Sequence, residues 1–220
     1  MALCAELRAL LPPETAQAWE TIAPLIPDHY RLAGGTALAV HLHHRRSRDL
    51  DFFSVDPAPD LPALEQRLAE LGAFAVSSRA VGTLNGLFEG ARVQFLDAHS
   101  EVELAPPERH EGILVSSLPD IFAMKVKVIG DRGELRDYFD LKRIEELTGR
   151  RVEEGIGLYM ARYRIPPEHA SIEHIVEALG YLDDVDDDDL LPEDRGTIAR
   201  YWAARQREIT INLNRFPSSS

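Results

Sequence analysis

The stretch YRLAGGTALAVHLHHRRSRDLDFFS, residues 30–54, contains the features that decide the fold of this chain. It holds a double glycine followed by a hydroxyl at residues 34–36, an arginine cluster around one serine at 45–48, and an acid-x-acid pair between large apolar residues at 49–53. The apolar pattern predicts a strand before the glycines, a helix after them, and a second strand through the acidic pair.

The acid-x-acid pair is expected to present both of its carboxylates on one face of the second strand. Successive side chains of a strand alternate, so Leu50 and Phe52 share one face, and Asp49 and Asp51 point together to the other. Two carboxylates held side by side repel each other unless a cation sits between them. A hard divalent metal such as Mg²⁺ is the usual reason for such a placement.

The double glycine lies between a predicted strand at residues 31–33 and a predicted helix at 36–44. Gly34 and Gly35 let the backbone approach a ligand closely, and the amides at a helix start favour anions. Phosphate and metal sites this close together suggest phosphoryl or nucleotidyl transfer. Taken singly, the glycines are better explained as a turn and the acids as a solvated edge strand. Both motifs together, with basic residues between them, favour a site.

The composition is that of a globular chain of 220 residues, 45% of them hydrophobic, which is enough for one large domain or two closely packed lobes. No apolar run is long enough to span a membrane, and no signal-peptide pattern follows Met1. A single cysteine, Cys4, excludes an internal disulfide and a cysteine metal cluster. We therefore expect a cytoplasmic protein without a membrane partner.

The net charge of −13 argues at first against a nucleic-acid partner. Residues 181–194 hold eight acids and no base, so the rest of the chain carries only −5, which leaves room for local basic grooves. The acidic stretch itself is interpreted as a solvated loop or as a docking surface for a basic partner.

Hydrophobic spacing predicts the remaining elements, with strands in the first half of the chain and helices in the second. The first half is expected to contain helices within residues 2–26 and at 60–72, antiparallel strands across 73–97, and a short strand at 113–115. Either Asn85-Gly86 or Glu89-Gly90 is expected to form a tight turn. The second half is expected to contain helices at 118–130, 134–148, 150–163, 168–180 and 192–212. The tail, residues 216–220, is expected to fray.

Two charged side chains lie on apolar faces of the predicted helices. Lys125 either extends along its own stem to solvent or points into a groove as a charge for phosphate, and the spacing leaves both open. Asp137 on an apolar face is costly unless it is paired or metal-bound, which makes it a functional candidate. Asp140 is one turn from Arg136 and Arg143, so an ordinary surface ion pair explains it adequately.

These motifs are similar to those of a known family. The arrangement of a double glycine with a hydroxyl, a helix and an acid-x-acid pair resembles the nucleotidyltransferase superfamily of the polymerase-beta type. LAGGTAL followed by R-x-S-x-D-L-D-F-F, within residues 32–53, and DIFAMKVKVIGDRGELRDYFDL, residues 120–141, resemble the abortive-infection nucleotidyltransferase toxins of the AbiEii/AbiGii family.

The resemblance implies an α/β (α+β) fold in two lobes. A nucleotidyltransferase-like lobe with a small mixed sheet would span residues 1–115, and a helical lobe would span residues 116–220. The resemblance further implies a metal-dependent nucleotidyltransferase that acts as a toxin, with its site in the cleft between the lobes.

The resemblance also implies roles for individual residues. Asp49 and Asp51 would hold Mg²⁺ or Mn²⁺. Lys125 would neutralise charge on the phosphates, and Asp137 would orient or deprotonate the attacking hydroxyl. The remaining residues that match the family's nucleotide-binding positions are Gly34, Gly35, Thr36, Ser47, Arg48 and Asp140.

A third carboxylate often lies on a neighbouring strand in this superfamily. The predicted strand VQFL offers Gln94 in its middle and Asp97 at its end. Because Gln94 cannot supply a negative charge, the three-acid version of the site is in question.

The implied partners are an NTP, an acceptor that in related toxins is often a tRNA 3′ end, and a cognate antitoxin. Two other hypotheses stay open. One is a nucleotide-binding regulator with the fold but no transfer activity, which Gln94 supports. The other is a nucleotidyltransferase that labels a protein side chain.

Overall fold

Strands β1 (Tyr30–Ala33) and β2 (Asp49–Ser54) lie at the centre of a sheet in the computed structural model, which describes residues 2–213. Seven strands pair in the order β3-β4-β5-β2-β1-β7-β6. The other strands are β3 (Phe74–Ala80), β4 (Thr83–Phe88), β5 (Ala91–Asp97), β6 (Glu108–His110) and β7 (Ile113–Val115). The predicted tail at 216–220 lies outside the described residues.

The sheet is mixed. β2 pairs in parallel with β5, and β1 pairs in parallel with β7, whereas the remaining neighbours are antiparallel. The predicted antiparallel strands across residues 73–97 are confirmed as β3, β4 and β5. The tight turn between β4 and β5 falls at Glu89 and Gly90, which have φ of 49° and 87°, whereas Gly86 lies inside β4. The predicted α/β class is therefore confirmed.

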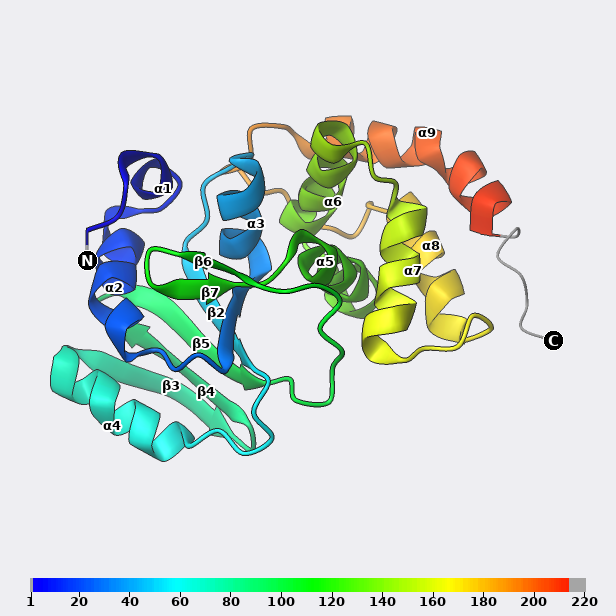
Figure 1. The fold of residues 1–220 in the computed structure, drawn as a ribbon. Helices are drawn as coiled ribbons and strands as arrows, with labels where there is room; N and C mark the ends of the chain where they lie inside the picture. Colours follow the sequence, from blue (N-terminus) through cyan, green and yellow to red (C-terminus); the bar gives the residue numbers. More distant parts are fainter. Residues whose placement is uncertain (1, 214–220) are drawn as a thin grey trace. The chain divides into compact units, whose positions relative to one another are not determined.

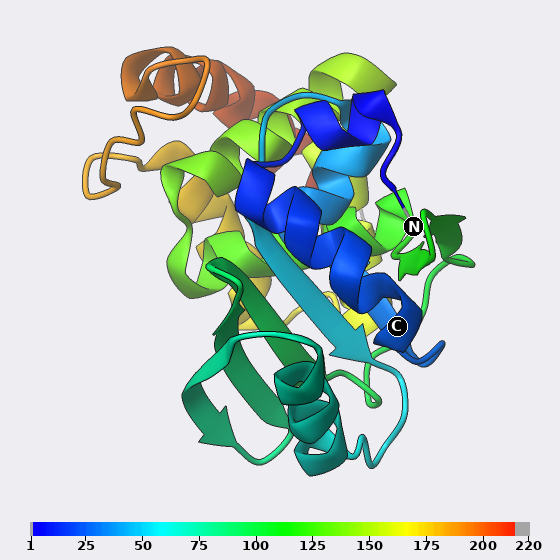
Figure 2. The ribbon, with the colours of Figure 1, turned by 90° about the vertical axis from the view of Figure 1, so that its left-hand side faces the viewer.

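One face of the sheet is closed by helices of the first half of the chain. α2 (Pro13–Ile22) and α4 (Leu61–Leu71) pack against it, as Figure 2 shows. Phe52 on β2 and Phe95 on β5 stack with ring centroids 5.2 Å apart, and both side chains are fully buried. Burial of such large apolar surface is the main favourable term for this half. The other elements here are α1 (Ala5–Ala9), η1 (Ala23–Leu25) and α3 (Gly34–Leu42).

Helix α3 begins and ends two residues earlier than its predicted range of 36–44. It begins at Gly34 and ends because His43 adopts a left-handed conformation with φ of 51°, so its amide bonds back to Ala39. The loop that follows, residues 43–48, carries the arginine cluster to the start of β2.

The second half of the chain is helical, as predicted. Its helices are α5 (Leu118–Arg132), α6 (Leu135–Thr148), α7 (Val152–Tyr163), α8 (Ala170–Gly180) and α9 (Arg195–Leu213). Each predicted helix is confirmed with ends shifted by at most three residues. The largest shift is at the start of α9, because the Asp194 carboxylate accepts the Thr197 amide and caps the helix there.

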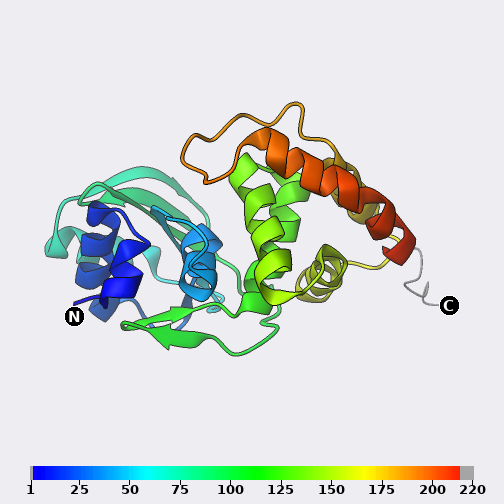
Figure 3. The ribbon, with the colours of Figure 1, turned by 90° about the horizontal axis from the view of Figure 1, so that it is seen from above.

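Helix α9 lies across α6 and α8 (Figure 3) and is fixed by buried polar contacts. Arg205 donates to Glu145 at 3.0 Å and to Glu153 at 2.7 Å, and the Trp202 indole donates to the carbonyl of Tyr138. These groups are almost fully buried, so each charge depends on its partners.

The acidic stretch at 181–194 is anchored to the helices and is not a freely solvated loop. Leu182 and Val185 are buried, and Glu193 accepts a 2.7 Å hydrogen bond from Lys142 on α6. Its aspartates at 183, 184, 186, 187 and 189 are exposed.

The described chain divides into two units (Figure 1). Unit 1 runs up to Glu101 and resumes at Ala105–Leu118, and unit 2 comprises Val102–Leu104 and the chain from Pro119 onward. The short segment Val102–Leu104 belongs to unit 2 because the Leu104 amide donates to Asp120, and the Val102 carbonyl accepts from Arg162. Within residues 2–213, no helix combines the length and the apolarity needed to cross a membrane.

Candidate active site

The two aspartates of β2 share one face of the sheet in unit 1, as predicted. Burial alternates along the strand: Leu50 and Phe52 are fully buried on one face, and Asp49 and Asp51 are partly exposed on the other. Two carboxylates on one strand face are hard oxygen donors of the kind that Mg²⁺ prefers. The described residues contain no cluster of three or more His, Cys, Asp or Glu around a possible ion. A divalent ion held by this pair would complete its shell with phosphate and water oxygens, as Mg²⁺ commonly does.

The first glycine of the pair is packed against the second aspartate. Gly34 has a φ of 68°, and a Cβ built on it would lie 2.4 Å from Oδ2 of Asp51. A side chain is therefore excluded both by the left-handed backbone and by the carboxylate. The glycine allows the Asp51 carboxylate to lie directly against the start of α3, and the backbone amides of a helix start favour an anion.

We predict that Gly34→Ala displaces the Asp51 carboxylate. Gly90→Ala is the matched control, because Gly90 also has a left-handed φ of 87°, but a Cβ built on it would have no atom within 4 Å. Both changes carry the left-handed strain of about 1–2 kcal/mol. Only Gly34→Ala should also abolish Mn²⁺ binding by the protein, measured by electron paramagnetic resonance. Equal Mn²⁺ binding in the two variants would contradict this contact.

The threonine after the glycines joins the helix to the strand that carries the acids. Thr36 is fully buried, and its hydroxyl donates to the backbone carbonyl of Asp49 and hydrogen-bonds Ser47 Oγ at 2.9 Å. These bonds fix the start of β2, and with it the Asp49 side chain, relative to the glycine turn. The structure shows this positioning contact for Thr36; direct contact with a nucleotide stays a prediction.

An arginine that was not among the predicted site residues lies over the second glycine. A Cβ built on Gly35 would be 2.7 Å from a guanidinium nitrogen of Arg45 and 3.1 Å from Ser47 Oγ. Arg45 also donates to the carbonyl of Arg46 at 3.0 Å. The predicted residue, Arg48, is exposed, and its backbone carbonyl accepts from Thr15. The spacing of two between Arg45, Ser47 and Asp49 is the sequence signal that could have identified Arg45 as a site residue.

The neighbouring strand β5 presents a base and an amide beside the two acids. Register places Arg92 opposite Asp49 and Gln94 opposite Asp51, and all four side chains share one face. Nε of Arg92 is 3.8 Å from Oδ1 of Asp49. The sheet thus confirms that Gln94 occupies the position next to Asp51.

Asp97 does not take the place of a third carboxylate. It pairs with Ser54, three residues along from Asp51, and therefore lies on the opposite face and ~10 Å along the strand. Its carboxylate accepts the backbone amide of His99 at 3.0 Å, and this bond, with the His99 ring, lowers the pKa of Asp97.

Unit 2 contains the other candidate residues in one buried cluster. Nζ of Lys125 on α5 lies 2.7 Å from Oδ1 of Asp137 and 2.6 Å from Oδ2 of Asp140, both on α6. The exposed fractions are 6% for Lys125, 5% for Asp137 and zero for Asp140. Of the two interpretations left open for Lys125, extension to solvent is therefore wrong, because its ammonium is held between two carboxylates.

The interpretation of Asp140 as a surface residue is also wrong. Asp140 is completely buried and bridges to Lys125, whereas Arg136 pairs with Glu134, and Arg143 pairs with Glu146. Sequence spacing pointed to the arginines one turn away, but the helix turns this carboxylate inward toward α5.

Asp137 has both oxygens engaged. Oδ1 accepts from Lys125, and Oδ2 accepts the backbone amide of Glu134 at 3.1 Å, which closes a capping box at the start of α6. The position of Asp137 on an apolar helix face is thus explained by its ion pair with Lys125 and by its capping bond. Asp137 could act in catalysis only if Lys125 left its Oδ1 oxygen.

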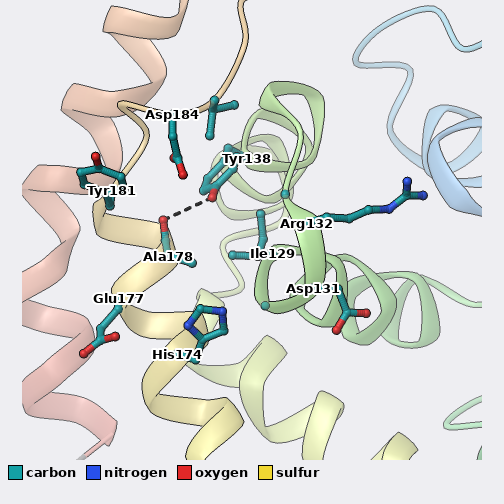
Figure 4. Close-up of a pocket in the computed structure, with 12 residues that line it drawn as sticks. Ile129, Asp131, Arg132, Tyr138, His174, Glu177, Ala178, Tyr181 and Asp184 are labelled. Carbon is teal, nitrogen blue, oxygen red and sulfur yellow. Dashed lines mark hydrogen bonds between the residues drawn. The ribbon is translucent and has the colours of Figure 1, made fainter.

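Unit 2 also contains a hollow of about 490 Å³. It is walled by the end of α5, by Tyr138 and by α8, and the Tyr138 hydroxyl donates to the carbonyl of Ala178 at 3.3 Å (Figure 4). The side chains of Asp131 and Glu177 point away from Tyr138 on opposite sides (Figure 4). The candidate residues do not line this hollow.

Comparisons with known proteins identify the family to which the chain belongs. A family model described as the nucleotidyl transferase AbiEii toxin of a type IV toxin–antitoxin system matches residues 20–215. A protein of Aquifex aeolicus named as uncharacterised is 30% identical over 175 residues, which cover 78% of this chain and 82% of that protein. The chain belongs to the AbiEii nucleotidyltransferase toxin family.

Two solved structures share the fold. A Helicobacter pylori protein assigned provisionally as a nucleotidyltransferase superposes with a TM-score of 0.55 at 17% identity, covering 91% of this chain and 93% of that one. The JHP933 protein of the same organism superposes with a TM-score of 0.54 at 17% identity, covering 96% and 95%. These two structures show the fold, whereas membership of the family gives the enzyme class, nucleotidyltransferase, and implies an NTP substrate and a cognate antitoxin.

The structure assembles the predicted residues into two groups. Unit 1 gathers the residues of the glycine turn, the loop and β2, namely Gly34, Gly35, Thr36, Ser47, Asp49 and Asp51. Unit 2 gathers Lys125, Asp137 and Asp140. That the two groups line one cleft stays a prediction.

Proposed function

We propose that this toxin is a metal-dependent nucleotidyltransferase that moves a nucleotide from an NTP to an RNA acceptor, such as a tRNA 3′ end, in the cytoplasm. The observation that carries the proposal is the packing of the Asp51 carboxylate against Gly34, with Asp49 on the same strand face. This packing supports the proposal because two carboxylates that would hold a cation lie beside a helix start whose amides would bind an anion.

The nucleotide site is assigned to the glycine turn and its loop. Backbone amides at Gly34 and Gly35 would receive phosphate oxygens, and Arg45 and Ser47 over Gly35 would contact them from the side. Arg48 and Asp140 match the family's nucleotide-binding positions, and Arg48 is exposed enough to reach a ligand. Asp49 and Asp51 would hold Mg²⁺ or Mn²⁺, which when bound supplies charge neutralisation at the phosphates.

We propose that the nucleotide-binding lobe spans residues 1–115 and the helical lobe residues 116–220, except that Val102–Leu104 belongs to unit 2 and unit 1 extends to Leu118. In the proposed reaction the acceptor hydroxyl oxygen forms a bond to the α-phosphorus, and the bond between the α-phosphorus and the bridging oxygen breaks. Pyrophosphate then leaves. Lys125 moves from Asp137 to the phosphates, which frees Oδ1 of Asp137 to accept the hydroxyl proton.

The test is an incubation of the protein with each radiolabelled NTP, Mg²⁺ and total cellular RNA or total protein. We expect label in RNA of tRNA size, and we expect chelation of the metal to abolish the labelling. Label in the protein pool would instead identify a side-chain acceptor. The basic surface that RNA binding needs would come from the arginine loop, since the chain as a whole is acidic.

One observation favours a second candidate, a nucleotide-binding regulator without transfer activity. Gln94 stands opposite Asp51, where related enzymes often have an acid. In that case neither the RNA nor the protein becomes labelled, and the protein still binds NTP in equilibrium dialysis.

A further inference from the structure

The face of the sheet that carries the two aspartates also carries a guanidinium from β5. Arg92 is opposite Asp49 in the parallel register, so both side chains rise from adjacent strands on the same side. Its Nε is 3.8 Å from the Asp49 carboxylate, farther than a hydrogen bond. The Arg92 side chain is 62% exposed and the Asp49 side chain 19%. This ion pair is loose and can be exchanged at little cost.

The charge balance of the four side chains around this ion pair differs from that of a three-acid site. Asp49, Asp51 and Arg92 sum to −1, and Gln94 beside Asp51 adds nothing. A divalent ion would change the sum to +1, whereas three carboxylates with the same ion would remain at −1. The face is therefore less attractive to a bare cation and, once the cation is present, more attractive to a triphosphate.

We propose that Arg92 makes metal binding depend on the nucleotide. Without NTP the guanidinium stands beside Asp49 and competes with the metal. When NTP enters with its metal ion, Arg92 leaves Asp49 for the phosphate oxygens, where a guanidinium forms strong charge-assisted bonds. Arg92 is thus a positioning residue for ordered binding of the metal–NTP complex. This inference rests on the proposed function.

The experiment titrates the full chain with Mn²⁺, followed by electron paramagnetic resonance, with and without a non-hydrolysable α,β-methylene NTP. Arg92→Ala is compared with Arg79→Ala, a matched control. Arg79 is also 62% exposed, lies on the same sheet and pairs with a carboxylate, Glu65. Arg92→Gln keeps the length and polarity of the side chain and removes the charge.

Arg92→Ala and Arg92→Gln should bind Mn²⁺ alone about fivefold more tightly than the unaltered protein, as expected for losing one partly screened neighbouring charge. With the analogue present they should bind Mn²⁺ more weakly than the unaltered protein. The ratio of the Mn²⁺ affinities with and without the analogue, which measures the coupling between metal and nucleotide, should therefore be smaller in these variants. Arg79→Ala should change neither value. A merely structural role for Arg92 would shift both titrations in the same direction.

Unchanged coupling in Arg92→Ala, or a parallel loss in both titrations, would overturn the role of Arg92 while leaving the proposed function in place. Asp51→Ala separates the two ideas. If it binds Mn²⁺ as the unaltered protein does, or if the unaltered protein binds no Mn²⁺ even with the analogue, the metal site itself is wrong, and the role of Arg92 is overturned with it.

Discussion

Asp51→Ala should abolish nucleotide transfer and leave the fold intact. The carboxylate is one of two charges that would neutralise the metal, and its loss removes the group packed against the start of α3. Metal positioning and charge stabilisation supply most of a phosphoryl-transfer rate, so transfer should fall by about a hundredfold to a thousandfold or more. Toxicity on expression should fall with it. The free energy of unfolding should stay the same or rise slightly, because like-charge repulsion with Asp49 is relieved.

Two quantities are measured on the same samples: the rate of nucleotide transfer and the free energy of unfolding in urea. Asp51→Asn keeps the shape of the side chain and should be as inactive as the alanine variant. Asp97→Ala, at the end of the adjacent strand and on the opposite face, is the matched control and should retain transfer. Full activity in a normally folded Asp51→Ala protein would rule out the proposed role of this aspartate in a metal-dependent transfer.

Lys125→Met should lower both stability and transfer. The lysine lies between two buried carboxylates, so its removal leaves Asp137 and Asp140 facing each other without their shared cation. Breaking a buried ion pair by removing one partner costs about 3–5 kcal/mol of unfolding free energy. Lys127→Met is the control, because Lys127 is 41% exposed and pairs with Asp131 on the surface; that change should cost less than about 1 kcal/mol.

A second change separates the structural from the catalytic share of this effect. Asp140→Asn added to Lys125→Met returns the cluster to its original net charge and should recover part of the stability. Transfer should not recover, because the ammonium that would move to the phosphates is still missing. Recovery of transfer together with stability would show that Lys125 acts only on the fold.

Patterns carried by consecutive residues were predictable from the sequence. The period of two along β2 determined which side chains share a face, and helical spacing located α5 to α9 to within a few residues. Gly34 could be singled out as a position of close approach, because only glycine readily takes that backbone conformation.

Contacts set by register and helix rotation were not predictable. The position of Arg92 beside Asp49 depends on the pairing register of β5 with β2. A shift of one residue in that register would have put Arg92 on the other face of the sheet. Arg45 over Gly35 depends on the path of an irregular loop. Asp140 was placed at the surface because arginines lie one turn away, yet packing of α6 on α5 turns it to Lys125.

The central claim is that the acids of unit 1 and the Lys125 cluster of unit 2 act on one nucleotide. A crystal structure with Mn²⁺ and a non-hydrolysable α,β-methylene NTP, phased to show the anomalous signal of manganese, tests it most directly. We predict a manganese peak between Asp49 and Asp51, phosphates over Gly34 and Gly35, and the Lys125 ammonium within contact of the same nucleotide. A manganese ion bound away from Asp51, or a nucleotide out of reach of Lys125, would contradict the claim.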